Sequence, residues 1–393
     1  MSERSTSTGP GTRSGRGPAR IATAVAVAVA VLAPLAVLCA QAWSSTGDNL
    51  AFVRDERRGV VYLQPLTRLL GATTEAQSAA VGGRPVDVAG VRAAVTAVDA
   101  ADALVGGPLR TTDRWTDVRR TVTDRVSRGS WPLAATAYTQ YSDLNTVLLE
   151  LNRTVGDNSK LILDPAIDAY YVMNATLLRI PEILVDSGRY ADLSVLSAAS
   201  AAADPTGQAQ PATAQAQLAA ARNRIASDAN DLADGLVKAF ARTGSATLGP
   251  GLTRQLDNFR TAVDAVAPST SLLAPVPTRS LSDLAGDRTT LQRAALDLQQ
   301  AALGQLDLLL RSRASDAQRT RAVSLAATAV GVLVAAGLAT LVWRRSGPRA
   351  TPASRHAETP STAPTAGPDP VRAAPADAVP VRAGRGGGAR AAR

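Results

Sequence analysis

The chain has 393 residues, of which 46% are hydrophobic, so it is long and apolar enough to form a sizeable core. Its single cysteine, Cys39, excludes an internal disulfide and a cysteine-ligated metal cluster. Its single histidine, His356, excludes a Ser/His/Asp triad and a multi-histidine zinc site. Only carboxylate chemistry stays open, and we expect no enzyme activity, no metal and no cofactor.

The net charge of +9 is confined to the two ends of the chain. Between residues 43 and 321, lysine plus arginine equals aspartate plus glutamate in number, whereas the first 20 residues and the residues after Trp343 carry an excess of arginine. This distribution argues against nucleic acid as a partner. Arginines beside a membrane span are attracted to anionic lipid head groups, so membrane lipids are the expected partners.

The first element in the chain is an uncharged apolar segment at residues 21–42, after a basic tail at residues 1–20. Its 22 residues are enough for a helix to cross a hydrocarbon core of about 30 Å. The small residues of Ala40-Gln41-Ala42 also fit a signal-peptide cleavage site, but the apolar run exceeds a usual signal core. We therefore predict a transmembrane helix, with cleavage as the alternative.

Residues 43–321 show apolar positions at steps of three and four, which indicate amphipathic helices. The clearest stripe is Ala134, Ala137, Tyr141, Leu144, Leu148, Leu151 and Val155, and a second is Val88, Val91, Val95, Val98 and Val105, with Asp102 intruding. Further stripes start at Trp115, Ile225 and Leu252. Without convincing strand alternation, the predicted fold class is all-α: a helical bundle, or two stacked bundles, of about eight helices.

Glycine- and proline-rich stretches predict the loops between these helices. The strongest are Gly82 to Pro85, Gly106 to Pro108, Gly129 to Pro132, Asp204 to Gly207, Gly249 to Gly251 and Pro268 to Pro277. Gly47, Gly59 and Pro65 are expected to bend the helix that follows the first span.

The last predicted helix begins near Ser282 and continues into a second apolar segment of 22 residues at 322–343. Arginines precede the first span and follow the second, so the positive-inside rule places both termini in the cytoplasm and residues 43–321 outside it. The expected location is the plasma membrane. The segment 344–393 is rich in proline, alanine, glycine and arginine and is predicted to be a disordered cytoplasmic tail.

The stretch at residues 155–184, VGDNSKLILDPAIDAYYVMNATLLRIPEIL, differs from the alanine- and valine-rich chain around it. Asp164 and Pro165 are typical of a helix N-cap and first helical position, and the turn leading in is predicted at Gly156-Asp157. Pro181 should kink this helix, and Gly188 should end it.

The order of residues in this stretch resembles the exported sensory region of bacterial methyl-accepting chemotaxis proteins and related membrane signalling receptors. The matching features are Gly156-Asp157, Asp164-Pro165, Asp168 before Tyr170-Tyr171, and Arg179-Ile180-Pro181-Glu182. A second, looser match is ERRGVVYLQPLTRLL at residues 56–70, just after the first span. The resemblance implies a sensory helical bundle between two spans that works as a dimer.

Arg179, Asp168, Tyr170 and Tyr171 are the candidate ligand-binding residues. A guanidinium on the apolar stretch around Arg179 needs a carboxylate partner, which a bound organic acid or an internal acid could supply. Asp164, Pro165 and Pro181 are expected to have structural roles. Asp164 and Asp168, one turn apart, leave a carboxylate-based hydrolase as a minor alternative.

We expect a sensor that binds a small ligand or an envelope partner and signals through a second copy or another membrane protein. The need for a partner follows because only a tail of about 50 residues follows the second span. The alternative is a structural or accessory envelope protein without ligand or catalytic activity.

Overall fold

The computed structural model describes residues 17–163, 166–203, 212–268 and 280–345. All regular structure in these residues is helical, which confirms the all-α prediction. The elements in chain order are α1 (Gly17–Val81), α2 (Val88–Leu109), α3 (Thr112–Ser127), α4 (Ala134–Asn158), the 3-10 turn η1 (Leu161–Leu163), α5 (Ile167–Asn174), the π-helical turn η2 (Ala175–Arg179), α6 (Ile180–Ala203), α7 (Ala212–Arg242), α8 (Leu248–Val266) and α9 (Leu281–Arg345). Residues 1–16 and 346–393, with most of both predicted tails, lie outside the described residues.

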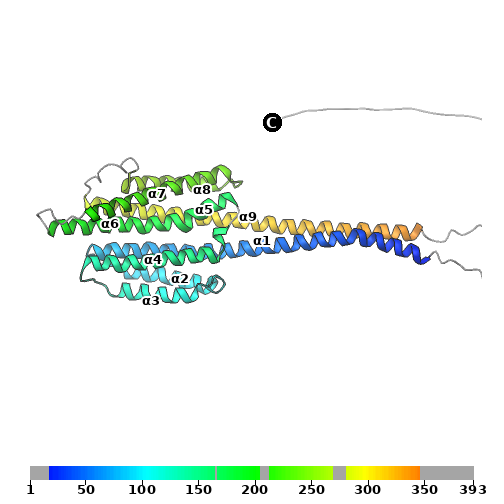
Figure 1. The fold of residues 1–393 in the computed structure, drawn as a ribbon, viewed down its shortest axis with the longest axis horizontal. Coiled ribbons are helices and arrows are strands. Elements are labelled where there is room, and N and C mark those ends of the chain that lie inside the picture. Colours follow the sequence, from blue (N-terminus) through cyan, green and yellow to red (C-terminus); the bar gives the residue numbers. More distant parts are fainter. Residues whose placement is uncertain (1–16, 164–165, 204–211, 269–279, 346–393) are drawn as a thin grey trace, which may run out of the picture. The chain divides into compact units, whose positions relative to one another are not determined.

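Consecutive helices pack side by side (Figure 1). The first helix, α1, lies between α2 and α4, while α3 packs on α2 and α4. In the second half of the chain α7 packs against α5, α6 and α8, and α6 joins the halves through contacts with α1 and α4. Buried apolar side chains from both halves form one continuous cluster.

The predicted apolar stripes are buried in this cluster. In α4 the stripe from Ala137 to Val155 is buried, and so are Trp115, Val118, Val122 and Val126 of α3. In α2 the middle valines of the stripe are buried, while Val88 and Val105 at its ends are only partly covered. The intruding Asp102 is also buried, where it accepts hydrogen bonds from the hydroxyls of Tyr62 and Thr111, both at 3.0 Å.

Two predicted loops are parts of helices. Gly106 to Pro108 lie in the last turns of α2, and the chain turns at Arg110, whose φ is 53°. Gly249 to Gly251 lie in the first turn of α8, where the missing N–H of Pro250 has no helical partner to lose. The loops at Gly83 and Gly129 occur as predicted, with φ of 67° and 69°, whereas residues 204–207 and 269–277 lie outside the described residues.

The first and last long helices, α1 and α9, are antiparallel partners. Glu75 pairs with Arg288, Arg57 Nε lies 2.8 Å from Asp307 Oδ1, the Arg321 guanidinium stacks on Trp43, and Gly331 faces Leu35. These contacts occur in opposite order along the two helices, whose outer parts extend beyond the other helices of the bundle (Figure 1). The bends predicted at Gly47, Gly59 and Pro65 do not interrupt α1.

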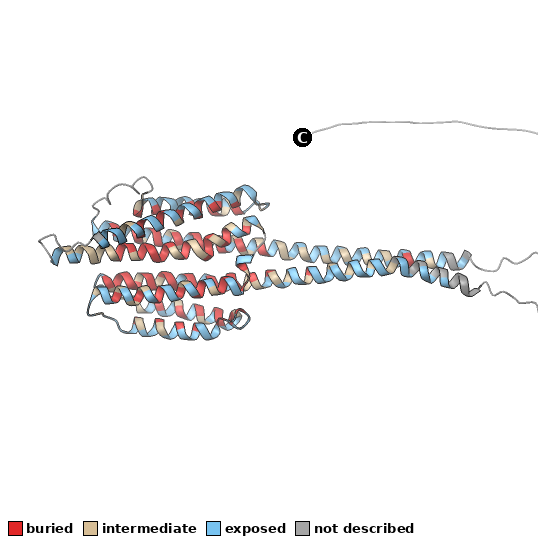
Figure 2. Ribbon diagram, viewed as in Figure 1, coloured by how far each residue is buried: buried red, intermediate tan, exposed pale blue. Residues whose placement is uncertain are grey.

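One helix in the described part of the chain, α9, contains a segment long and apolar enough to cross a membrane. Its apolar side chains there are uncovered: Val323 is 69% exposed and Leu333 71%. In Figure 2 exposed residues predominate along the extended ends of α1 and α9, in contrast to the buried residues inside the bundle. An exposed apolar surface of this length is typical of a membrane-spanning helix.

Candidate functional site

The stretch predicted as a receptor-like helix forms α5, η2 and α6 without a break. The described helix begins at Ile167, and Asp164 and Pro165 lie outside the described residues. The helix does not end at Gly188 as predicted, but continues to Ala203. Gly188 is needed for packing instead, because a Cβ atom there would lie 2.4 Å from Thr74 Cγ2 of α1.

Before Pro181, at Ala175–Arg179, the helix forms a wider π-helical turn, η2, a feature that the kink prediction did not specify. Pro181 has no N–H, so the Leu177 carbonyl loses its usual donor four residues on. The Ile180 N–H bonds to the Ala175 carbonyl, five residues back, and therefore leaves the Thr176 carbonyl without its usual donor as well. Two adjacent backbone acceptors are thus freed inside a buried helix.

Side-chain amides from two other helices bind these freed carbonyls. Asn152 Nδ2 of α4 donates to the Leu177 carbonyl at 2.6 Å, and Gln299 Nε2 of α9 donates to the Thr176 carbonyl at 2.8 Å. Both amide side chains are 2% exposed. The turn before Pro181 is therefore a buried junction of α4, α6 and α9.

The two stretches that carry the receptor resemblance contact each other. A Cβ atom on Gly59 of α1 would lie 2.4 Å from Ser159 Oγ, and one on Gly156 of α4 would lie 2.3 Å from Leu177 Cδ2. Lys160 Nζ lies 2.9 Å from Asp55 Oδ2 beside this contact. Gly156 lies inside α4 rather than in the predicted turn, and its missing side chain leaves room for Leu177.

Arg179, the first candidate ligand-binding residue, is paired with acids of the neighbouring helix α7. Its Nη1 lies 2.5 Å from Asp228 Oδ1 and its Nη2 lies 3.0 Å from Asp231 Oδ2. Glu182, one turn further along its own helix, is 3.9 Å away. The sequence left two possible partners for Arg179, an acid of the protein or a bound organic acid, and in the structure acids of the protein pair with it.

The other three candidates contact different residues from those that pair with Arg179. Asp168 accepts a hydrogen bond of 2.8 Å from the Thr243 hydroxyl at the end of α7, and Arg313 of α9 lies 3.5 Å away. The rings of Tyr170 and Tyr171 meet edge to face, with centroids 5.4 Å apart. Tyr171 packs on Gly235 of α7, while Tyr170 is 43% exposed. Asp168, Tyr171 and Arg179 therefore attach α5 and α6 to α7.

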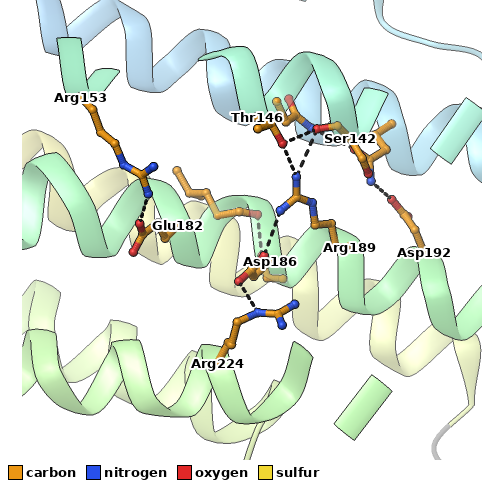
Figure 3. A network of polar contacts seen from close by, with 12 residues as sticks. Ser142, Thr146, Arg153, Glu182, Asp186, Arg189, Asp192 and Arg224 are labelled. Carbon is orange, nitrogen blue, oxygen red and sulfur yellow. Dashed lines mark hydrogen bonds and ion pairs between the residues drawn. The ribbon is translucent and has the colours of Figure 1, made fainter. Parts of the chain in front are cut away.

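A groove of about 500 Å³ lies beside Arg179, between α4, α6 and α7. We call it the α4–α6–α7 groove; its lining residues are Thr146, Leu149, Glu150, Arg153, Glu182, Asp186, Arg189, Arg224, Ser227 and Asp228. Figure 3 shows Arg153 and Arg189 on either side of the acids of α6, with Arg224 reaching Asp186 from α7.

Ion pairs connect the three helices across this groove. Arg153 Nη2 lies 2.6 Å from Glu182 Oε1, and Asp186 is 3.4 Å from Arg189 and 3.2 Å from Arg224. Arg153 and Arg224 have about half of their side chains exposed, and each uses one nitrogen in its pair with an acid of α6. Their acid partners are more covered, with 23% of the Glu182 side chain and 12% of the Asp186 side chain exposed, so an anionic ligand would bind the remaining guanidinium nitrogens rather than replace these pairs.

Two carboxyl groups near the groove have raised pKa values. Burial raises the pKa of Asp228 to about 6, although the adjacent Arg179 opposes this shift. Burial also raises the pKa of Asp192 to about 6, against the lowering effect of hydrogen bonds that include one from Gln77. Asp192 is 2% exposed on α6 and accepts a 2.8 Å hydrogen bond from Gln77 Nε2 of α1.

The groove was missed in the sequence, although its residues follow a helical pattern. Glu150 and Arg153 on α4, Glu182, Asp186 and Arg189 on α6, and Arg224 and Asp228 on α7 are spaced three or four apart. Charged residues at this spacing define one polar face per helix. A search for polar as well as apolar stripes would have found each face, but not that the three faces meet.

Comparisons with protein-family models, with curated proteins and with solved structures gave no match.

Proposed function

We propose that the chain is an integral membrane sensor whose helical bundle lies outside the cytoplasm, where it binds a small organic acid in the α4–α6–α7 groove or an envelope partner. In this proposal it signals through a second copy or another membrane protein. The observation that carries the proposal is the unbroken course of α1 and α9, which run from the bundle core into the apolar segments.

The contacts of α6 support a connection between the groove and α1. Asp186 and Arg189 of α6 line the groove. Gly188 and Asp192 of the same helix contact Thr74 and Gln77 of α1. A ligand that shifted α6 would therefore act directly on the helix that leads to the first apolar segment.

The proposed topology has two membrane spans, at residues 21–42 and 322–343, with both termini in the cytoplasm. The exposed apolar side chains of α9 and the arginines outside the two segments support it. The resemblance to chemotaxis receptors favours a dimer in the plasma membrane. In the same proposal, the helices before and after α5 form two bundles that share one core.

A structural or accessory envelope protein is the second candidate. The observation in its favour is that Arg179 and Asp168 already have partners on α7 and α9. A scaffold without ligand would keep these pairs as fixed connections between helices.

A thermal-shift screen of the full-length protein in detergent separates the two candidates. If an organic acid binds the folded state, the melting temperature rises, with a stabilisation of about 2.7 kcal/mol when the ligand is at 100 times its Kd. Arg224→Gln should abolish the shift. Arg260→Gln, which changes an exposed arginine of α8 outside the groove, should retain it. No shift with any organic acid, amino acid or aromatic compound would favour the accessory protein.

A further inference from the structure

A cation–π pair joins α1 and α9 at the end of both apolar segments. The guanidinium carbon of Arg321 lies 3.4 Å from the centroid of the Trp43 ring. Trp43 directly follows the apolar run at residues 21–42, and Arg321 directly precedes the run at residues 322–343. The Trp43–Arg321 pair therefore lies at the end of both apolar segments that is nearer to the bundle.

The edge of this guanidinium lacks an acceptor in the described part of the chain. Arg321 Nε is buried there without a hydrogen bond. Stacking on the indole satisfies the face of the guanidinium, and Nε is covered, so the Nη groups are the part of Arg321 that can bind a planar or tetrahedral anion.

Exposed apolar side chains follow Arg321 along α9. Leu325, one helical turn further on the same side of the helix, is 46% exposed, whereas Val323, which is 69% exposed, lies on a different side. A ligand that suits this surface combines an anionic group with a hydrocarbon chain. Free phosphate has the charge but cannot cover these side chains.

We propose that Arg321, held against Trp43, binds the phosphate of a phospholipid head group in the leaflet that faces the bundle. This inference rests on the membrane spans of the proposed function. Phosphate oxygens accept paired hydrogen bonds from a guanidinium, and indole side chains favour the same interfacial level. A bound lipid would fix the register of α1 and α9 where they enter the membrane.

Native mass spectrometry of the full-length protein, delipidated in a nonionic detergent and titrated with phosphatidylglycerol, tests the proposal. Arg321→Gln should weaken lipid binding at least about tenfold, because a charge-assisted hydrogen-bond pair is lost. Arg321→Lys should give an intermediate affinity, since the charge stays but the planar fork does not. The matched control is Arg319→Gln, which removes an exposed arginine from the same turn and should bind like the unchanged protein.

Equal lipid binding by Arg321→Gln, or an equal loss with Arg319→Gln, would overturn the proposal. So would equal binding of a glycolipid without phosphate, or Arg321-dependent binding of inorganic phosphate that matches the lipid. Alkaline extraction of cell membranes separates this failure from that of the proposed function. If carbonate releases the protein, the membrane spans themselves are wrong; if the protein stays and Arg321→Gln keeps its lipid, only the lipid site is wrong.

Discussion

At the scale of single residues, Asp192 has the most demanding position in the core. Its carboxyl group is buried between α6 and α1 and receives a hydrogen bond from Gln77, which in turn accepts one from Asn145 of α4. Arg288 of α9 and Glu75 of α1 act on it electrostatically in opposite directions. Because burial has the largest effect, the protonated form is favoured and the pKa rises to about 6 from its ordinary value of 3.8.

This shift predicts that the protein becomes more stable as the pH falls from about 7 to about 5. Between pH 3.8 and about 6 the folded state binds a proton that the unfolded state does not, so the stabilising contribution is present at low pH and is lost as the pH rises through about 6. The expected gain is about 1 kcal/mol, or a few degrees in melting temperature.

Thermal melting at several pH values measures this effect, and Asp192→Asn should reduce the slope. A smaller slope of the same sign should persist from Asp228, whose pKa is raised as well. If Asp192→Asn left the pH dependence unchanged, the assignment to this carboxyl group would be wrong.

At the scale of elements, the π-helical turn η2 explains why the proline of the receptor-like stretch does not break its helix. Pro181 alone predicts a kink, because the sequence shows which N–H is missing but not which groups replace it. Asn152 is 25 residues from Leu177 along the chain, and Gln299 is 123 residues from Thr176. The replacement donors follow only from the tertiary arrangement.

A double-mutant cycle between Asn152 and Pro181 should show strong coupling. In the natural background Asn152→Ala leaves the buried Leu177 carbonyl without a donor and should cost about 1–3 kcal/mol of unfolding free energy. In a Pro181→Ala background the new N–H can bond to this carbonyl, so the same substitution should cost at least about 1 kcal/mol less.

Chemical denaturation of the four proteins measures this coupling. Asn258→Ala, on the exposed face of α8, serves as the control and should change stability by less than about 0.5 kcal/mol in either background. Additive effects of Asn152→Ala and Pro181→Ala would contradict the proposed replacement of the missing backbone donor.

Apolar periodicity predicted the helices and their buried faces well. Side chains three and four residues apart, such as Leu144, Leu148 and Leu151, lie on one face of a helix, and that face has to turn toward the core. Glycine was less informative. Gly59, Gly156 and Gly188 resemble helix breakers in the sequence, yet each allows a side chain of another helix to approach closely. Arg179 was correctly singled out as needing acids, but the identity of those acids depends on the placement of α7.

At the scale of the whole molecule, α1 and α9 connect the buried core of the bundle to an exposed apolar region, both within the unit formed by residues 1–343. Their inner parts contribute fully buried residues to the bundle, such as Leu63 and Leu298, while the outer part of α9 exposes valine and leucine. The contacts from Glu75–Arg288 to Leu35–Gly331 keep the two helices in one register between these parts. This continuity is the physical basis of the proposed signalling across a membrane.

Labelling of single cysteines with a membrane-impermeant maleimide in intact cells tests this topology most directly. In a Cys39→Ala background, Ser130→Cys between α3 and α4 should react in intact cells, because the bundle is expected outside the cytoplasm. Ser5→Cys and Ser354→Cys, near the two termini, should react only after the membrane is permeabilised. Reaction of all three in intact cells, or protection of Ser130→Cys together with the termini, would contradict a sensor whose bundle faces outward on two membrane spans.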